Sequence, residues 1–361
     1  MGNRQYAKCK GKLIIGFRSL SIVRCLLTLP CCLLLITNCQ LSIAQDIHFS
    51  QLNHSQLFMN PATAADMTGD MAASLRYRKQ WPGIGKGYGT NAATFEMSLL
   101  RQKSNTNYLG VGVYIVSDKA GKAQLQTFEG VGSLAYHLRT GTTERFSMGL
   151  SLGYVQRSIR TDGLAWDAQH NGIAFDAALD NRETFGNQSR SIVDGTFGLL
   201  WWHSSKTEWK FGYSLGHFLQ QRTFLDAGSD KLSAKHSAHF MLKYKIPFMY
   251  VVYIRYDLQV QRQAGAMTIL PGVMAERRIG NDSRYTGANT SSGIMAGCYY
   301  RIGDAIVPTI GFEWERMLSL FISYDITLSS FNKAVGTGGG PEITLRYEGK
   351  KTRGVARLSE E

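Results

Sequence analysis

The chain has 361 residues, and its 40 Lys and Arg against 27 Asp and Glu give a formal net charge of +13 at pH 7. Six of the basic residues and none of the acidic ones fall in residues 1–44, so 34 basic and 27 acidic residues, a net charge of +7, remain beyond them. Such a mild, dispersed excess argues against binding to nucleic acid. No later window approaches the roughly 18 apolar residues of a transmembrane helix, so we expect a soluble protein or one that crosses a membrane with strands.

Residues 1–44 have the organisation of an export signal. Basic residues precede the apolar run CLLTLPCCLLLI, residues 25–36, and small residues follow at Ser42 and Ala44. We therefore expect a signal peptide over residues 1–44, with Cys39 as an alternative lipidation site that Asn38 makes unfavourable. Five of the six cysteines lie in this leader, so the exported chain is expected to have no internal disulfide.

Residues 45–71 lead into the rest of the chain without strand-like alternation. Phe49, Leu52, Gln56 and Met59 recur at helical spacing. The segment is long enough to fold back as a short helix. We expect an N-terminal plug or periplasmic segment here.

The stretch RKQWPGIGKGYGT, residues 78–90, has the glycines, lysine and threonine of many phosphate-binding loops. A phosphate-binding loop of that kind needs its lysine and hydroxyl residue on the first turn of a helix. Here Gly87 follows Lys86, and the next residues, NAATFEMSLL, alternate with the period of a strand. The stretch is interpreted as a hairpin loop, with Trp81 anchored at a membrane interface and no nucleotide bound.

From residue 72 onward the sequence alternates with a period of two. In LFISYDITL, for example, Ile322 and Tyr324 fall on one face and Ser323 on the other. Segments of this kind begin near residues 72, 90, 107, 124, 144, 190, 207, 235, 250, 266, 292, 305, 318 and 341. The pattern predicts an all-β fold, a closed antiparallel transmembrane β-barrel of about 14 strands over residues 72–348, with apolar side chains toward lipid and polar ones toward the lumen.

A soluble all-β protein, such as a pair of sandwiches, is the alternative. The scarcity of proline, seven in 361 residues, the strand length and the lack of a domain break favour the barrel. An even number of strands places both barrel termini in the periplasm, so we expect the cell outer membrane as the location and its lipid as a partner. Residues 349–361 are expected to form a basic periplasmic tail.

Charges of both signs fall on the polar face of the predicted strands. Mixed signs at this density favour ion pairs that hold strand register and plug, whereas an ion-selective porin would show more of one sign. The candidate lumen residues are Arg76, Arg78, Glu96, Arg255, Asp257, Glu313, Glu315 and Asp325.

Two segments match an enzyme motif in sequence but lack the local structure that the motif requires. GLSLG, residues 149–153, and GYSLG, residues 212–216, match the nucleophile elbow, but that elbow needs a sharp strand-to-helix turn and both copies lie mid-strand. The histidines offer no metal-binding spacing, and the acidic residues of the long link near residue 170 lack the spacing of a calcium loop. We therefore expect no enzyme activity, no cofactor and no metal.

The links between strands fall into two groups. If the first strand leaves the periplasm, the links WPGIGKGYG, SDKAGKA and the long segment over residues 161–188 lie outside the cell, and most opposite links are short, as periplasmic turns are. The longer RRIGNDSRYTGANTS falls on the periplasmic side and does not fit this rule. Aromatic and acidic residues in the outer links suit a protein partner. The candidate partner-binding residues are Trp166, Asp167, Phe175, Asp176, Phe185, Trp81, Asp118 and Lys119.

Several stretches, taken together and in order, resemble one known family. They include QDIHFSQLNHSQLFMNPATA, RYRKQWPGIGKGY, GVGVYIVSDKAG, YRIGDAIVPTIGFEW, LFISYDITLSS and GGGPEITLRY. They are similar to the PorP/SprF family of Bacteroidetes outer-membrane proteins, from about Gln45 to Tyr347. The chain departs from the family in its long, cysteine-rich leader and in the tail after Tyr347.

The resemblance implies a FadL-like barrel that acts in type IX secretion and gliding motility. On this basis we expect a protein that helps secrete or anchor a large surface adhesin. Its expected partners are that adhesin, other type IX secretion components and a periplasmic peptidoglycan-linked protein. The alternative is a FadL-like uptake channel for small hydrophobic solutes, which would need a continuous path through the lumen.

Overall fold

The computed structural model describes residues 46–51, 56–81, 87–100, 107–121, 125–160, 164, 166–176, 178–180, 182, 189–219, 232–247, 251–280, 291–329 and 338–349. The predicted signal peptide and all but the first residue of the predicted tail lie outside these residues. In the described part of the chain, no helix has the length and apolar character to cross a membrane.

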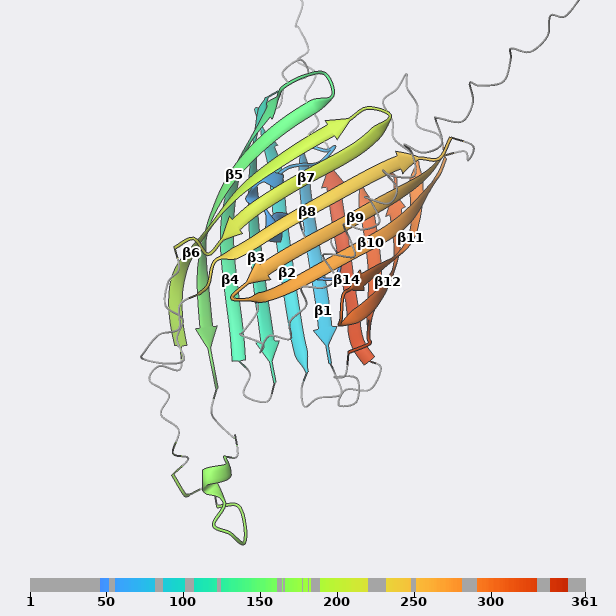
Figure 1. The fold of residues 1–361 in the computed structure, drawn as a ribbon. Helices are drawn as coiled ribbons and strands as arrows, with labels where there is room; N and C mark the ends of the chain where they lie inside the picture. The colour runs from blue at the N-terminus through green and yellow to red at the C-terminus, as the bar shows by residue number, and fades with distance from the viewer. Residues whose placement is uncertain are drawn as a thin grey trace, which may run out of the picture. The chain divides into compact units, whose positions relative to one another are not determined.

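The described residues form fourteen antiparallel strands that close into a barrel (Figure 1). The strands are β1 (Met71–Gln80), β2 (Tyr88–Leu99), β3 (Tyr108–Ala120), β4 (Leu125–Arg139), β5 (Glu144–Ser158), β6 (Ser189–Ser204), β7 (Thr207–Gly216), β8 (Lys235–Lys245), β9 (Val252–Gln263), β10 (Ala266–Ile279), β11 (Ser292–Arg301), β12 (Ala305–Trp314), β13 (Leu318–Thr327) and β14 (Gly338–Gly349). Each begins within about three residues of a predicted start. The predicted closed fourteen-stranded barrel is confirmed.

The barrel closes where β1 pairs with β14, from Met71 opposite Gly349 to Arg78 opposite Glu342. All the remaining pairings join strands that are consecutive in the sequence. Closure leaves no unpaired sheet edge, which a strand structure in lipid requires.

The two faces of the wall have the polarity of a membrane barrel. Apolar side chains point outward, as at Leu75, which is 62% exposed, and Leu152, which is 54% exposed. The alternate residues, such as Arg76 and Ser151, are buried on the inner side. A soluble sandwich would have the reverse arrangement, so the alternation marks a wall that faces lipid.

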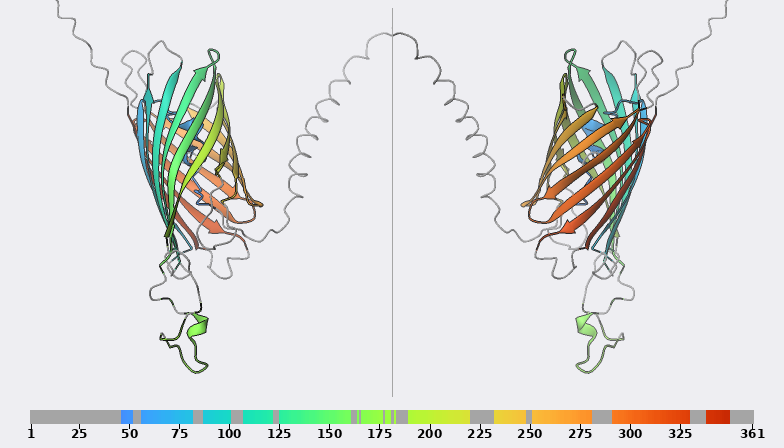
Figure 2. Two further views of the ribbon diagram at one scale, coloured as in Figure 1. Left: turned by 90° about the vertical axis from the view of Figure 1, so that its left-hand side faces the viewer. Right: turned by 90° about the vertical axis from the view of Figure 1, so that its right-hand side faces the viewer.

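The leading segment lies inside the barrel, where Figure 2 shows it in blue between the strands. It contains one helical turn, α2 (Gln56–Met59), and a 3₁₀ turn, η2 (Pro61–Thr63). The Asn60 side chain caps η2 by accepting from the Ala62 amide at 2.9 Å, and Pro61 occupies the first turn, where its missing N–H costs nothing. The turn η2 contacts β4, β5 and β6. We call residues 46–51 and 56–70 the plug.

Glycines on the inner face let the plug lie directly on the wall. A Cβ at Gly149 would lie 2.4 Å from the Ala62 nitrogen, and one at Gly198 would lie 1.9 Å from Asn60 Oδ1. A Cβ at Gly110 would likewise lie 2.0 Å from the Ala64 carbonyl oxygen. No larger residue fits at these positions unless the plug moves.

Candidate functional site

The plug runs along the lumen from one end of the barrel to the other. We call the end where residues 159–188 link β5 to β6 the long-loop end, and the end where residues 205–206 link β6 to β7 the short-turn end. Asp46 contacts Lys235, the first residue of β8 at the long-loop end, and Asp66 contacts Lys210 near the start of β7 at the short-turn end. The chain then enters β1 at the short-turn end.

Asp46 anchors the plug at the long-loop end. Its Oδ2 accepts from Lys235 Nζ at 3.0 Å and pairs with His217 Nε2, while His217 Nδ1 pairs with Asp194 at 2.8 Å. Burial disfavours the carboxylate, but Lys235 and His217 outweigh it and hold the pKa of Asp46 well below its usual value. Burial likewise disfavours the imidazolium of His217, yet Asp46 and Asp194 raise its pKa to about 9. We call Asp46, Asp194, His217 and Lys235 the Asp46 latch.

Two residues of the plug dock onto the closing seam of the barrel. The Ser50 and Gln51 amides donate to Glu342 of β14, at 2.8 and 3.2 Å. Arg78 of β1 donates to Asp325 of β13 at 2.8 Å, and Ser50 Oγ donates to the same carboxylate at 3.1 Å. These groups are nearly fully buried, so each charge is compensated by a partner rather than by water.

Aromatic side chains of the plug pack beside this seam. Phe49 and Phe58 have ring centroids 5.1 Å apart, and Phe58 lies 4.7 Å from the ring of Tyr114 in β3. The Arg76 guanidinium lies over Phe49, 4.4 Å from its centroid. This cation–π contact joins the plug to β1 in a site shielded from water.

Asp66 anchors the plug at the short-turn end. Its carboxylate pairs with Arg145 of β5 and accepts from Lys210 of β7 at 2.8 Å. Burial opposes ionisation, but Lys210 and Arg145 prevail and hold the pKa of Asp66 far below its ordinary value. Two residues before Asp66 in the chain, the Ala64 carbonyl oxygen lies 2.8 Å from His137 Nε2. We call Asp66, Arg145 and Lys210 the Asp66 latch.

Wall side chains fill part of the lumen on the other side of the barrel. A buried apolar cluster on β10 to β13 consists of Leu270, Met274, Met295, Tyr299, Val307 and Phe321. Each is at most 7% exposed. The plug and this cluster together occupy much of the interior that the described residues enclose, unlike the lumen of a water-filled pore.

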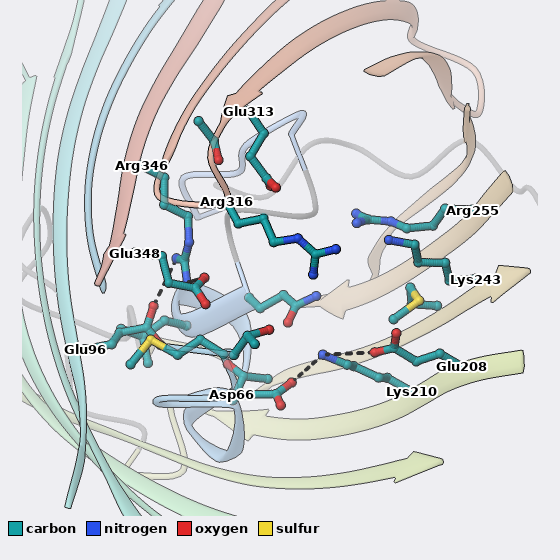
Figure 3. A pocket seen from close by; sticks show the side chains of 17 residues that line it. Asp66, Glu96, Glu208, Lys210, Lys243, Arg255, Glu313, Arg316, Arg346 and Glu348 are labelled. Carbon is teal, nitrogen blue, oxygen red and sulfur yellow. Dashed lines mark hydrogen bonds and ion pairs between the residues drawn. The ribbon is translucent and has the colours of Figure 1, made fainter. Parts of the chain in front are cut away.

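A cavity of about 240 Å³ remains at the short-turn end, between the plug and the wall (Figure 3). Five acidic residues line it, Asp66, Glu96, Glu208, Glu313 and Glu348, together with five basic residues, Lys210, Lys243, Arg255, Arg316 and Arg346. We call this space the vestibule. Its lining is charged, whereas the pockets that bind most drug-like ligands have a mainly apolar lining.

The structure places seven of the eight candidate lumen residues on the inner face of the wall, and it joins them to partners of opposite charge. Arg76 lies 3.8 Å from Glu342, Arg255 lies 3.0 Å from Asp257, and Glu96 lies 3.4 Å from Arg346. The remaining pairs are Arg78–Asp325 and Glu313–Arg278. Glu315 is the exception. β12 ends at Trp314, and Glu315 lies in the following turn with φ of 47°, so its place on the strand face is corrected.

The candidate partner-binding residues lie in different places. Trp81 follows β1 and stacks edge-on against Tyr88 at 5.3 Å. Asp118 and Lys119 belong to β3 rather than to a loop, because β2 and β3 stay paired as far as Tyr88 and Ala120, and Thr90 donates to Asp118 at 2.6 Å. Phe185 lies outside the described residues.

The long link contains a small ordered element. Trp166 leads into a 3₁₀ turn, η3 (Asp167–Gln169), and a bridge joins His170 to Phe175. The Asp176 amide donates to the Gln169 carbonyl at 2.8 Å. Three large apolar side chains among the described residues of the element are exposed, Ile173 at 93%, Phe175 at 49% and Leu179 at 39%. The candidate partner-binding residues predicted from sequence include Phe175 but not Ile173 or Leu179.

The serines of the two elbow-like motifs take part in structure. Ser151 Oγ donates to the Thr196 carbonyl of the next strand at 3.4 Å, and Ser214 Oγ donates to the Met59 carbonyl of the plug at 2.5 Å. Ser151 lies within β5 and Ser214 within β7, without the strand-to-helix turn that exposes a nucleophile. Among the described residues, no group of three or more His, Cys, Asp or Glu is placed to hold a metal ion.

A family model for the type IX secretion system membrane protein PorP/SprF matches residues 41–347. The chain belongs to the PorP/SprF family. Its membrane β-barrel and this family together indicate an outer-membrane protein, and the family implies other type IX secretion components as partners. The match covers every described strand up to the last residues of β14.

Solved structures similar to this PorP/SprF member include a transporter and a channel. The toluene transporter TbuX of Ralstonia pickettii has a TM-score of 0.48 and 11% identity, and the match covers 82% of this chain and 93% of TbuX. The monoaromatic hydrocarbon channel CymD has a TM-score of 0.48 and 11% identity, with 87% and 96% covered. The sequence matches none of the curated proteins with which it was compared.

Sequence reasoning missed several residues that hold the plug. Glu342 and Arg346 share the inner face of β14, and alternation in GGGPEITLRY was sufficient to find them. Asp46, Asp66 and His217 lie outside strands, so alternation carries no signal for them. Their partners are far away in sequence and become neighbours only when the barrel closes.

Proposed function

We propose that this PorP/SprF barrel helps the type IX machinery secrete a large adhesin or anchor it at the cell surface, with a connection to gliding motility, and that it has no enzymatic activity. The long-loop end is then extracellular and the short-turn end periplasmic. Family membership supports the secretion role. The adhesin, and a peptidoglycan-linked partner on the periplasmic side, are the finer parts of the proposal.

The observation that carries the proposal is the plug. Three sets of buried polar contacts hold it: the Asp46 latch, the Ser50–Glu342 contacts at the seam and the Asp66 latch. An anchor needs a rigid scaffold that presents loops, and a filled lumen provides such a scaffold. A channel for hydrophobic solutes needs a continuous path, so the same plug speaks against the alternative of an uptake channel.

The ordered element in the long link is the best candidate for the adhesin contact. Its backbone is fixed by internal hydrogen bonds, while Ile173, Phe175 and Leu179 remain exposed. Exposed apolar side chains on a preformed element are typical anchor residues of protein interfaces, because they bury area on binding with little ordering cost. Trp166 contributes an aromatic neighbour of the kind enriched in interface cores, and Asp176 a polar one of the kind found at interface rims.

The test is replacement of residues 161–188 by a short Gly/Ser turn in cells that secrete the adhesin. We expect the barrel to stay folded, as judged by its heat-modifiable migration on a gel, and surface retention of the adhesin to be lost. A finer variant, Ile173→Asp with Phe175→Ala, is expected to have the same effect. The matched control is Ala178→Ser in the same element.

Full display of the adhesin after loop replacement would contradict the assignment of this element. The anchoring contact would then lie on the plug or at the hairpin after β3. Loss of display with an unfolded barrel would be uninformative about the loop, which is why the finer variant is measured alongside.

A further inference from the structure

The vestibule contains one cationic group whose pairing is incomplete. Arg255 binds Asp257 through its Nε, at 3.0 and 3.2 Å from the two carboxylate oxygens. Its Nη2 is buried and has no hydrogen-bond partner among the described residues. A buried guanidinium N–H without an acceptor costs free energy, so a group that supplies an acceptor there gains more than it would in water.

Two further cations face the same space. In Figure 3 the side chains of Arg255, Lys243 and Arg316 point toward one another across one side of the vestibule. Lys243 also pairs with Glu276 at 2.6 Å, and Arg316 Nε donates to Ser291 at 3.2 Å, so these two are held in place by the wall. The three cations present a preorganised site for an anionic oxygen pair.

The remaining lining decides which anion fits. Glu96, Glu208 and Glu348 also line the vestibule, and the acidic and basic residues balance at five each. A multiply charged anion such as a phosphate monoester would be repelled by the acids. A single carboxylate attached to amide N–H donors matches both sides, since the carboxylate meets the cations and the N–H groups meet the acids.

The size of the space sets a second limit. About 240 Å³ is below the range of roughly 300–1,000 Å³ that holds drug-sized ligands, so the vestibule takes one or two residues of a peptide rather than a folded domain. The lining residues come from strand ends and turns at the short-turn end, such as Thr68 and Arg316, where a peptide from outside the barrel can enter.

We propose that the vestibule is a binding site for a carboxylate-bearing peptide segment, with Arg255 as the residue that recognises the carboxylate. The carboxylate comes from the C-terminus of a partner or from an acidic side chain. The site is independent of the adhesin contact proposed for the long link, which lies at the other end of the barrel. Failure of either proposal leaves the other standing.

The experiment uses the full-length barrel purified in detergent and three dansyl-labelled peptides. The first is Gly-Gly-Gly with a free C-terminal carboxylate, the second is the same peptide as its amide, and the third is the amide of Gly-Glu-Gly. We expect saturable binding of a carboxylate peptide and none of the Gly-Gly-Gly amide. Binding of the first peptide identifies a C-terminal carboxylate, and binding of the third alone identifies a side chain.

Arg255→Gln is expected to weaken the affinity for the carboxylate peptide about tenfold or more, because one charge-assisted contact is lost. The control is Arg139→Gln, an exposed arginine at the same end whose guanidinium binds the Gly141 and Thr142 carbonyls outside the vestibule. Arg255→Lys serves as a second variant if Arg255→Gln does not fold. The proposal is overturned if no peptide binds, if the Gly-Gly-Gly amide binds as tightly, or if the Arg255 and Arg139 variants bind alike.

Discussion

Gly149→Ala tests the seating of the plug most simply. The added Cβ would lie 2.4 Å from the Ala62 nitrogen and 2.5 Å from the Pro61 carbonyl carbon. Ordinary contact begins at 3.4 Å, so the plug backbone must move by about 1 Å. Overpacking of this kind costs about 1–3 kcal/mol. The expected result is a rise of about 5- to 150-fold in the opening of the plug, because about 1.4 kcal/mol corresponds to a factor of ten.

The assay is hydrogen exchange of the detergent-solubilised barrel followed by mass spectrometry. Peptides covering residues 56–66 are expected to lose protection in Gly149→Ala, while the strand peptides stay protected. Gly132→Ala is the matched control, because a Cβ there meets nothing within 4 Å. Equal protection of residues 56–66 in the two variants would refute the packing of the plug against β5.

Three further predictions concern the wall, the Asp46 latch and the orientation. Leu152→Arg, at an outward position 54% exposed, is expected to cost about 2–4 kcal/mol of barrel stability in urea unfolding. The pKa of His217 is raised from 6.5 to about 9, so the stabilisation that the imidazolium gives the Asp46 latch is full below pH 6.5 and is lost as the pH rises through 9. The pKa of Asp46 is lowered, so the stabilisation that its carboxylate gives is lost in acid. Exchange of residues 46–51, corrected for intrinsic rates, should therefore increase above pH 9, and constant protection would contradict the latch. Tags at Gly172 should be labelled on intact cells and tags at Thr142 should not, and labelling of the Thr142 tag would reverse the orientation.

Strands were predictable because lipid imposes a simple rule on sequence. In LFISYDITL every second side chain must be apolar, and β13 (Leu318–Thr327) follows that alternation. Strand ends were less predictable, since pairing continues beyond the lipid-facing part. The sequence pattern places Asp118 and Lys119 in a link between strands, but the β2–β3 ladder extends through both.

The residues on the inner face of the barrel could be identified from sequence, but their contacts with the plug could not. Alternation places Gly149 and Ser214 inside, yet no sequence pattern shows that Pro61 and Ala62 of the plug rest against Gly149 or that the Met59 carbonyl accepts from Ser214. The partners of Asp46 and Asp66 depend on barrel closure and on the course of the plug, and both are properties of tertiary structure. The vestibule was missed for the same reason, because its lining comes from strands on several sides of the barrel.

The most direct test of the central claim compares cells that lack this barrel with cells that carry it. Two quantities are measured in parallel: the amount of a type IX-secreted adhesin on the cell surface against that in the medium, and the rate of uptake of a small hydrophobic solute. We predict that deletion removes the adhesin from the surface and leaves uptake unchanged, and that the intact gene restores display. Normal adhesin display together with slower uptake would contradict the account and favour a channel.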